Sequence, residues 1–231
     1  MDTGLYHAVA AMRAGEKRLE SIAHNLANVS THGYKREQSF AHALAVGRSK
    51  NPQVVAGAAS DPSQGVLETT GNPLDLALEG KGFFVVETPS GRAYARDGSF
   101  RLDNDGALVT QDGFRVAWKN GRGTLRVADE MAVVDADGKV RQGENSIGQI
   151  EIVDVDDPAR LVPTADGRWS APPGVREIPS KASVRQSSLE RSNVEAMDEL
   201  VALVVVQRSF ENAASTLKAI EQSYRRLNQP R

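Results

Sequence analysis

Residues 203–227, LVVVQRSFENAASTLKAIEQSYRRL, predict one long helix with a coiled-coil pattern. Apolar residues recur in it at intervals of seven, in two series that are offset by three positions. Such an a/d heptad pattern aligns all of them along one seam of a helix. Ser192 and Glu195 precede the stretch at the spacing of a capping box, which favours a helix start near residue 194. The seam consists of Leu203, Phe210, Leu217 and Tyr224, and of Val206, Ala213, Ile220 and Leu227.

Residues 3–29 repeat this design at the other end of the chain. Gly15 is the weak seam position, because glycine costs about 1 kcal/mol relative to alanine inside a helix. We expect a helix from Thr3 to Asn28, ended by the Ser-Thr-His-Gly sequence at 30–33. The seam consists of Leu5, Met12, Leu19 and Leu26, and of Ala8, Gly15, Ile22 and Val29.

A heptad helix at each end of the chain requires a partner that its own segment does not supply. The two helices can pair with each other or with another copy of the chain. Two ordinary amphipathic helices of one globular domain are the alternative, although such helices tend toward a wider stripe of period 3.6. We therefore assign residues 1–34 and 192–231 to a helical, coiled-coil layer.

Residues 65–176 have the period-two alternation and the turn signals of a β domain. Leu76 and Leu78, for example, lie two positions apart, as residues on one face of a strand do, and an apolar, strand-like run begins at Phe83. Asn-Gly and Asp-Gly pairs favour tight hairpins, and their spacing predicts a mostly antiparallel sheet. The turn signals are Pro89-Ser90-Gly91, Asp97-Gly98, Asn104-Asp105-Gly106, Asp112-Gly113, Asn120-Gly121, Asp137-Gly138 and Asp166-Gly167.

Two segments flank the β domain, at 35–64 and 177–191. Both are rich in small and polar residues without firm periodicity, which predicts extended linkers that order only on docking. The expected fold class is therefore α+β: two terminal heptad helices that pair as a coiled coil, and a central, mostly antiparallel β domain.

Composition excludes several classes of protein. The chain has 28 basic and 30 acidic residues, and a net charge of −2 provides no electrostatic drive toward nucleic acid. The absence of cysteine excludes thiol catalysis, disulfides and cysteine-ligated metals. No run approaches the roughly 18 apolar residues of a membrane span, so no direct membrane insertion is expected. The start of the chain lacks an apolar segment behind basic residues, which predicts no cleaved signal peptide.

Catalytic, metal and cofactor sites are not indicated by any residue pattern. Gly80 and Gly82 resemble the start of a dinucleotide fingerprint, but they precede a strand and the third glycine is missing. Asp103 begins a sequence like part of a calcium loop, but Arg101 would occupy the first ligand position. The histidines lack metal-binding spacing, and they are His7, His24, His32 and His42. We expect a protein that is not an enzyme and that uses no cofactor.

Three blocks of sequence carry a resemblance to a known family. The first is NLANVSTHGYK at 25–35, and the second is NPLDLALEGKGFFVV at 72–86, continued by YARDGSF at 94–100. The third is LERSNV at 189–194, continued by QRSFE at 207–211. In this order they resemble the signatures of the bacterial flagellar axial proteins, which form the rod, the hook and the hook-associated structures.

The resemblance implies a structural subunit of the basal-body rod, which self-assembles axially into the drive shaft that transmits torque for motility. It implies other rod subunits, the flagellar type III export apparatus and the surrounding ring as partners. It places the protein in the periplasmic rod, after export without a cleaved signal peptide.

The resemblance also implies which residues matter for assembly. In the second helix they are all eight seam residues. In the first helix and where it ends they are Leu5, Met12, Leu19, Ile22, Leu26, Asn28, Val29, Thr31, Gly33 and Tyr34. Glycines let the backbone turn tightly into the strand of the second block, Asp97-Gly98 makes a hairpin turn, and Phe100 returns to the core. This β-domain motif consists of Gly80, Gly82, Phe83, Phe84, Asp97, Gly98 and Phe100.

Within the family, the opening residues 1–6 and the short length are similar to the proximal-rod subunit. The distal-rod subunit, or another axial subunit of the hook and basal body, is the alternative. A non-catalytic coiled-coil adaptor would explain the helices and the sheet, but it would not explain the three ordered blocks.

Overall fold

The structure is a computed structural model that describes residues 3–44, 53–121, 123–126, 131–164 and 166–227. Its chain divides into two compact units. The helical unit comprises residues 1–29, 36–61 and 194–231, and the β unit comprises residues 30–35 and 62–193. The fold is α+β, with two helices and a mostly antiparallel β-rich central region, as the sequence predicts.

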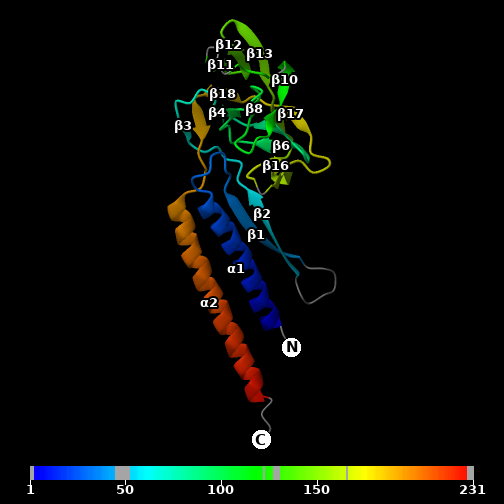
Figure 1. The fold of residues 1–231 in the computed structure, drawn as a ribbon. Helices are drawn as coiled ribbons and strands as arrows, with labels where there is room; N and C mark the ends of the chain where they lie inside the picture. Colours follow the sequence, from blue (N-terminus) through cyan, green and yellow to red (C-terminus); the bar gives the residue numbers. More distant parts are fainter. Residues whose placement is uncertain (1–2, 45–52, 122, 127–130, 165, 228–231) are drawn as a thin grey trace. The chain divides into compact units, whose positions relative to one another are not determined.

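The helical unit contains two long helices that lie side by side (Figure 1). They are α1 (Thr3–Ala27) and α2 (Ala196–Leu227). Asn25 hydrogen-bonds Glu199, whereas Gly15, more than two turns earlier in α1, faces Phe210 further along α2. The two helices therefore run antiparallel. Neither helix, over its described residues, is long and apolar enough to cross a bilayer.

A two-stranded hairpin completes the helical unit. Strands β1 (Glu37–Leu44) and β2 (Gln53–Ser60) pair in antiparallel register from Glu37↔Ser60 to Leu44↔Gln53. The Asp61 amide donates to the Arg36 carbonyl at 2.8 Å and extends this ladder. The prediction of an extended linker at 35–64 thus differs from the structure. The segment is rich in alanine and lacks clear alternation, so strand pairing left no pattern in its sequence.

The β unit contains all the other strands. The largest sheet has the path β15-β16-β6-β5-β9-β8-β7, with β14 joining β5 to β17. A second sheet has the order β10-β13-β12-β11, and β18-β4 and β19-β3 form two-stranded ladders. All these pairings are antiparallel. The strands are β3 (Leu67–Thr69), β4 (Leu76–Glu79), β5 (Phe83–Thr88), β6 (Gly91–Ala95), β7 (Arg101–Leu102), β8 (Leu108–Val109), β9 (Arg115–Val116), β10 (Trp118–Gly121), β11 (Ala132–Val134), β12 (Lys139–Gln142), β13 (Asn145–Ile150), β14 (Ile152–Val155), β15 (Val162–Pro163), β16 (Trp169–Ser170), β17 (Glu177–Pro179), β18 (Ser183–Gln186) and β19 (Ser188–Glu190).

The predicted linker at 177–191 also differs from the structure, because it supplies three of these strands. Val184 of β18 pairs with Leu78 of β4, and Leu189 of β19 pairs with Glu68 of β3. These partners lie more than a hundred positions away in the sequence. A pairing of this kind depends on the whole fold, so the local pattern of the segment does not reveal it.

Strand β5 separates two hydrophobic clusters. Phe84 belongs to one cluster with Phe100, and their rings meet edge to face at 5.2 Å. Phe83 and Val85 belong to the other cluster, in which Phe83 meets the Trp169 ring at 5.6 Å. Successive side chains of a strand point to opposite faces, so the Phe-Phe-Val-Val run is apolar because both of its faces are buried.

Most of the predicted turns join paired strands. Hairpins form at Pro89-Ser90-Gly91, Asn104-Asp105-Gly106, Asp112-Gly113, Asp137-Gly138 and Asp166-Gly167. Two predictions are wrong. Asn120-Gly121 lies inside β10, and Asp97-Gly98 lies between β6 and β7, which do not pair with each other. Asp97 instead accepts hydrogen bonds from the Ser99 amide and hydroxyl at 3.0 and 2.9 Å, which forms a local side-chain turn.

Candidate assembly surfaces

The predicted heptad seams are buried only in part. Ile22 of α1 and Val206 of α2 are each 4% exposed, whereas Leu19 and Phe210 remain 42% and 37% exposed. Half-buried seam positions are Met12, Gly15, Leu26, Val29, Leu203, Ala213, Leu217 and Ile220. The side chains of Leu5, Ala8, Tyr224 and Leu227 lie outside the described part of the structure. The pairing of α1 with α2 therefore covers the centre of each seam and leaves large apolar side chains at its margin.

A second apolar surface runs along α2, centred on the side opposite the buried seam residue Val206. We call it the outer stripe, and it consists of Met197, Leu200, Val201, Val204 and Val205, with exposures of 68%, 43%, 62%, 48% and 53%. Spacings of three and four residues place these side chains along one face of the helix. The first turns of α2 are thus apolar on both sides, a pattern typical of helices that are surrounded by protein.

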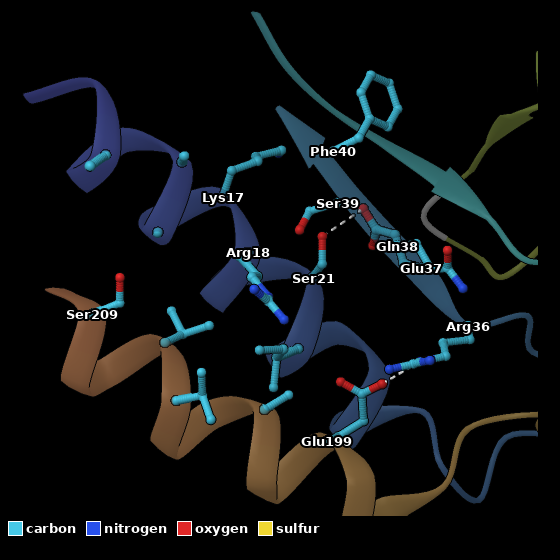
Figure 2. A pocket seen from close by; sticks show the side chains of 17 residues that line it. Lys17, Arg18, Ser21, Arg36, Glu37, Gln38, Ser39, Phe40, Glu199 and Ser209 are labelled. Carbon is cyan, nitrogen blue, oxygen red and sulfur yellow. Dashed lines mark hydrogen bonds and ion pairs between the residues drawn. The ribbon is translucent and has the colours of Figure 1, made fainter. Parts of the chain in front are cut away.

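A groove of about 760 Å³ opens in the helical unit between α1, α2 and the first residues of β1 (Figure 2). Small residues of both helices line it, including Ala11, Ala14, Gly15 and Ala202. Phe40 of β1 borders it and is 43% exposed. Arg18 of α1 also lines it and is exposed to solvent.

A buried polar cluster holds the hairpin against both helices. Asn25 is 1% exposed, and it exchanges two hydrogen bonds with the backbone of Glu37, at 2.7 and 2.9 Å. The Asn25 amide also donates to the Glu199 carboxylate at 3.2 Å. Glu199, which is 1% exposed, accepts a further charge-assisted bond from Arg36 Nε at 2.5 Å. One asparagine therefore fixes the start of β1 relative to α1 and α2.

A second buried cluster lies inside the β unit and joins the three sequence blocks. The Glu190 carboxylate, whose side chain is fully buried, pairs with Lys35 Nζ at 2.5 Å and with Arg96 at 3.2 Å. The Gly65 amide donates to the same carboxylate at 2.9 Å, and Lys35 also donates to the Ser63 carbonyl at 2.6 Å. Burial lowers the pKa of Arg96 below its ordinary value, and the neighbouring Glu190 charge opposes that shift.

Gly33 brings the first block against both the second and the third. It has a φ of +68°, and its amide donates to the Glu190 carbonyl at 2.7 Å. A Cβ at this position would overlap the backbone nitrogen of Asp97. Both the positive φ and the close approach therefore require glycine here.

The remaining motif residues have mainly structural surroundings. Asn28, just after α1, donates its side-chain amide to the His24 carbonyl at 2.9 Å. Thr31 is exposed and Tyr34 is half-buried. Gly80 and Gly82 have positive φ values just before β5. A Cβ on Gly98 would overlap the Leu76 carbonyl oxygen, so this glycine allows two segments of the β unit to approach closely.

Three family descriptions match the chain in order. "Flagella basal body rod protein" matches residues 5–35, "Flagellar hook protein FlgE/F/G D1 domain" matches 77–157, and "Flagellar basal body rod FlgEFG protein C-terminal" matches 185–229. The flagellar basal-body rod protein FlgF of Caulobacter vibrioides is 31% identical, over 94% of this chain and 93% of its own length. The chain belongs to the flagellar basal-body rod protein family. FlgF of Rhizobium meliloti is 32% identical, over 96% of this chain and 95% of its own length. FlgG of Bacillus subtilis is 29% identical, over 96% of this chain and 97% of its own length.

As a member of the rod protein family, the chain is a structural subunit of the flagellar basal body, which agrees with the resemblance in its sequence. Rod proteins named FlgF and rod proteins named FlgG both match it over nearly their full length. Within the described residues, no group of acidic residues and histidines is arranged to hold a metal ion.

Sequence reasoning about this rod protein missed its buried charges. Lys35, Arg96 and Glu190 lie in the quoted blocks, but nothing in their spacing indicates that they meet. Glu199 left a clearer signal, because it lies seven residues before Val206 and so interrupts the apolar seam with a carboxylate. A polar residue at a seam position often fixes the register of paired helices, and here Glu199 accepts bonds from Asn25 and Arg36.

Proposed function

We propose that this chain is an axial rod subunit whose two terminal helices pair as a coiled coil and form the inner layer of the rod. The β unit forms the outer layer in this proposal. Many such subunits, stacked along the axis, transmit torque without any catalytic step.

The observation that carries the proposal is the outer stripe. Full burial of a valine, leucine or methionine side chain contributes about 1.5–3 kcal/mol relative to its exposed state. Five such side chains are 43–68% exposed along one face of α2, while Val206 on its other face is already buried. A helix that is apolar on both sides gains from neighbours on both sides, which an assembly of parallel subunits supplies.

Within the family, we assign the chain to the proximal rod, as a FlgF-type subunit. The resemblance of its residues 1–6 to proximal-rod subunits favours this assignment, and the FlgF relatives at 31% and 32% identity agree with it. The distal rod is the alternative, because FlgG relatives match over the same span. Labelled subunits located in purified basal bodies by electron microscopy distinguish the two positions.

The proposal includes the route by which the subunit reaches the rod. The chain leaves the cytoplasm through the flagellar type III apparatus without a cleaved signal, and it joins the periplasmic rod inside the surrounding ring. An absence of cysteine suits a chain that passes through a channel into an oxidising compartment. Loss of the export apparatus is expected to retain the intact chain in the cytoplasm.

Gene deletion in a flagellated host tests the function directly. We expect loss of swimming and basal bodies without a complete rod, and we expect the intact gene to restore both. Normal swimming of the deletion strain would overturn the assignment. Complementation with a variant that carries Val201→Asp and Val204→Asp should fail, although the protein is made and exported.

A further inference from the structure

We propose that the outer stripe of one copy docks into the groove of a second copy, and that this contact joins successive subunits. The inference rests on the proposed axial assembly and names the surfaces that make it. Both surfaces belong to the helical unit, so each copy offers one stripe and one groove.

The stripe and the groove lie on different sides of the unit. Val206 lines the groove and is buried, whereas Val204, two residues earlier, is 48% exposed on the stripe. Each helical residue turns the chain by about 100°, so residues two positions apart point in nearly opposite directions. Val205 lies at the border of the two surfaces and lines the groove as well.

The two surfaces complement each other in side-chain size. The stripe presents branched and long apolar side chains, and the helix walls of the groove include the small residues Ala11, Ala14, Gly15 and Ala202 beside the larger Ile22 and Val206. Large residues that face small ones interdigitate, which lets two helices approach closely. A stripe that met another stripe would instead bring large side chains against large side chains.

The charges beside the two surfaces are also complementary. Arg18 lines the groove, and Asp198 lies next to Met197 at the edge of the stripe. Both side chains are exposed, and neither forms an ion pair with the described residues of its own chain. Besides Arg18, the groove carries Lys17, Arg36, Glu37 and Glu199, of which Lys17 pairs with Glu20 and Arg36 pairs with Glu199. The Arg18 charge in the groove and the Asp198 charge at the edge of the stripe favour this pairing over contact between two copies of the same surface.

A contact between two different surfaces has a geometric consequence. Each added copy leaves one free groove and one free stripe, so the contact repeats. Such a contact closes into a ring if the rotation between copies closes, and otherwise it generates an open helical assembly. This is the kind of growth that an axial structure requires.

Intermolecular cross-linking tests the contact, and the chain suits it because it contains no cysteine. Purified full-length Ala14→Cys and Val201→Cys proteins are mixed and oxidised over a series of concentrations. We expect the mixed disulfide dimer to exceed either homodimer by several-fold. Ser215→Cys is a matched control, because it is exposed on α2 beyond the stripe, and it should give no excess of mixed dimer with Ala14→Cys. A predominance of disulfide dimers between two Val201→Cys chains, or no disulfide dimer at any concentration, would overturn the proposal.

Charge exchange provides a second, independent measurement. Arg18→Glu and Asp198→Arg should each weaken self-association in sedimentation velocity by roughly 2- to 5-fold, and the double variant should regain it. If the double variant instead loses self-association by the sum of the two single effects, Arg18 and Asp198 do not pair. Failure of this contact is distinguishable from failure of the proposed function, since a chain that builds rods but gives no mixed cross-link would refute the contact alone.

Discussion

The Lys35 ammonium and the Glu190 carboxylate lie 2.5 Å apart in the interior of the β unit, although 155 positions separate them in the sequence. Arg96 joins the same carboxylate, so residues of all three sequence blocks meet at one buried charge. A buried ion pair adds little more to folding stability than well-packed apolar residues would. Removal of one partner is nevertheless strongly destabilising, because the remaining partner keeps an uncompensated buried charge. The cluster therefore fixes the path of the chain where the β unit begins and ends.

Replacement Glu190→Gln should strongly destabilise the β unit. It leaves Lys35 and Arg96 buried without a counter-charge, and removal of one partner from such a pair costs about 3–5 kcal/mol. Both tryptophans, Trp118 and Trp169, lie in the β unit, so tryptophan fluorescence during urea unfolding of the full chain reports this unit.

The matched control for that prediction is Glu68→Gln. Glu68 lies near Arg191 at 3.7 Å, but both side chains are about 60% exposed. We expect a change below about 1 kcal/mol, as for most surface ion pairs. Equal effects of the two substitutions would show that burial does not determine the importance of Glu190.

Replacement Gly33→Ala should lower the free energy of unfolding through two effects. The positive φ costs about 1–2 kcal/mol for a residue with a Cβ, and that Cβ would also overlap the Asp97 backbone. Gly71→Ala separates these effects, because Gly71 has a φ of +80° and nothing within 4 Å of the added carbon. Gly33→Ala should be clearly the more destabilising, and equal unfolding midpoints in urea would refute the steric argument.

Tyr94 should ionise later than an ordinary tyrosine. Burial, and then the hydrogen bond that its hydroxyl donates to Glu177 at 2.7 Å, raise the pKa of Tyr94 to about 12. Because the folded pKa lies above the unfolded value, the stabilisation is complete below pH 10 and is lost as the pH rises toward 12. Ultraviolet titration of tyrosinate should show one late component, which Tyr94→Phe removes. Survival of that component in the variant would assign it to another tyrosine.

The extent to which the sequence predicts this structure depends on how local each signal is. Heptad residues such as Ile22 and Val206 indicate the helices, and Asp112-Gly113 indicates a hairpin, because these patterns repeat over a few residues. Pairing of β18 with β4 leaves no such pattern, since its partners are distant in the chain. The Lys35–Glu190 pair is equally hidden, because a charge in the sequence predicts a solvated surface unless the fold buries it.

The outer stripe should matter for assembly and not for folding of the free chain. Val204→Asn replaces a side chain that is 48% exposed, so we expect little change in helix content or unfolding midpoint by circular dichroism. Val206→Asn, two residues later, places an amide where the side chain is 4% exposed, and it should cost about 1–3 kcal/mol. Both variants should reduce swimming when they complement the deletion strain, but only Val204→Asn should do so as a stably folded protein. If Val204→Asn supports normal swimming, the exposed face of α2 does not require a neighbouring subunit.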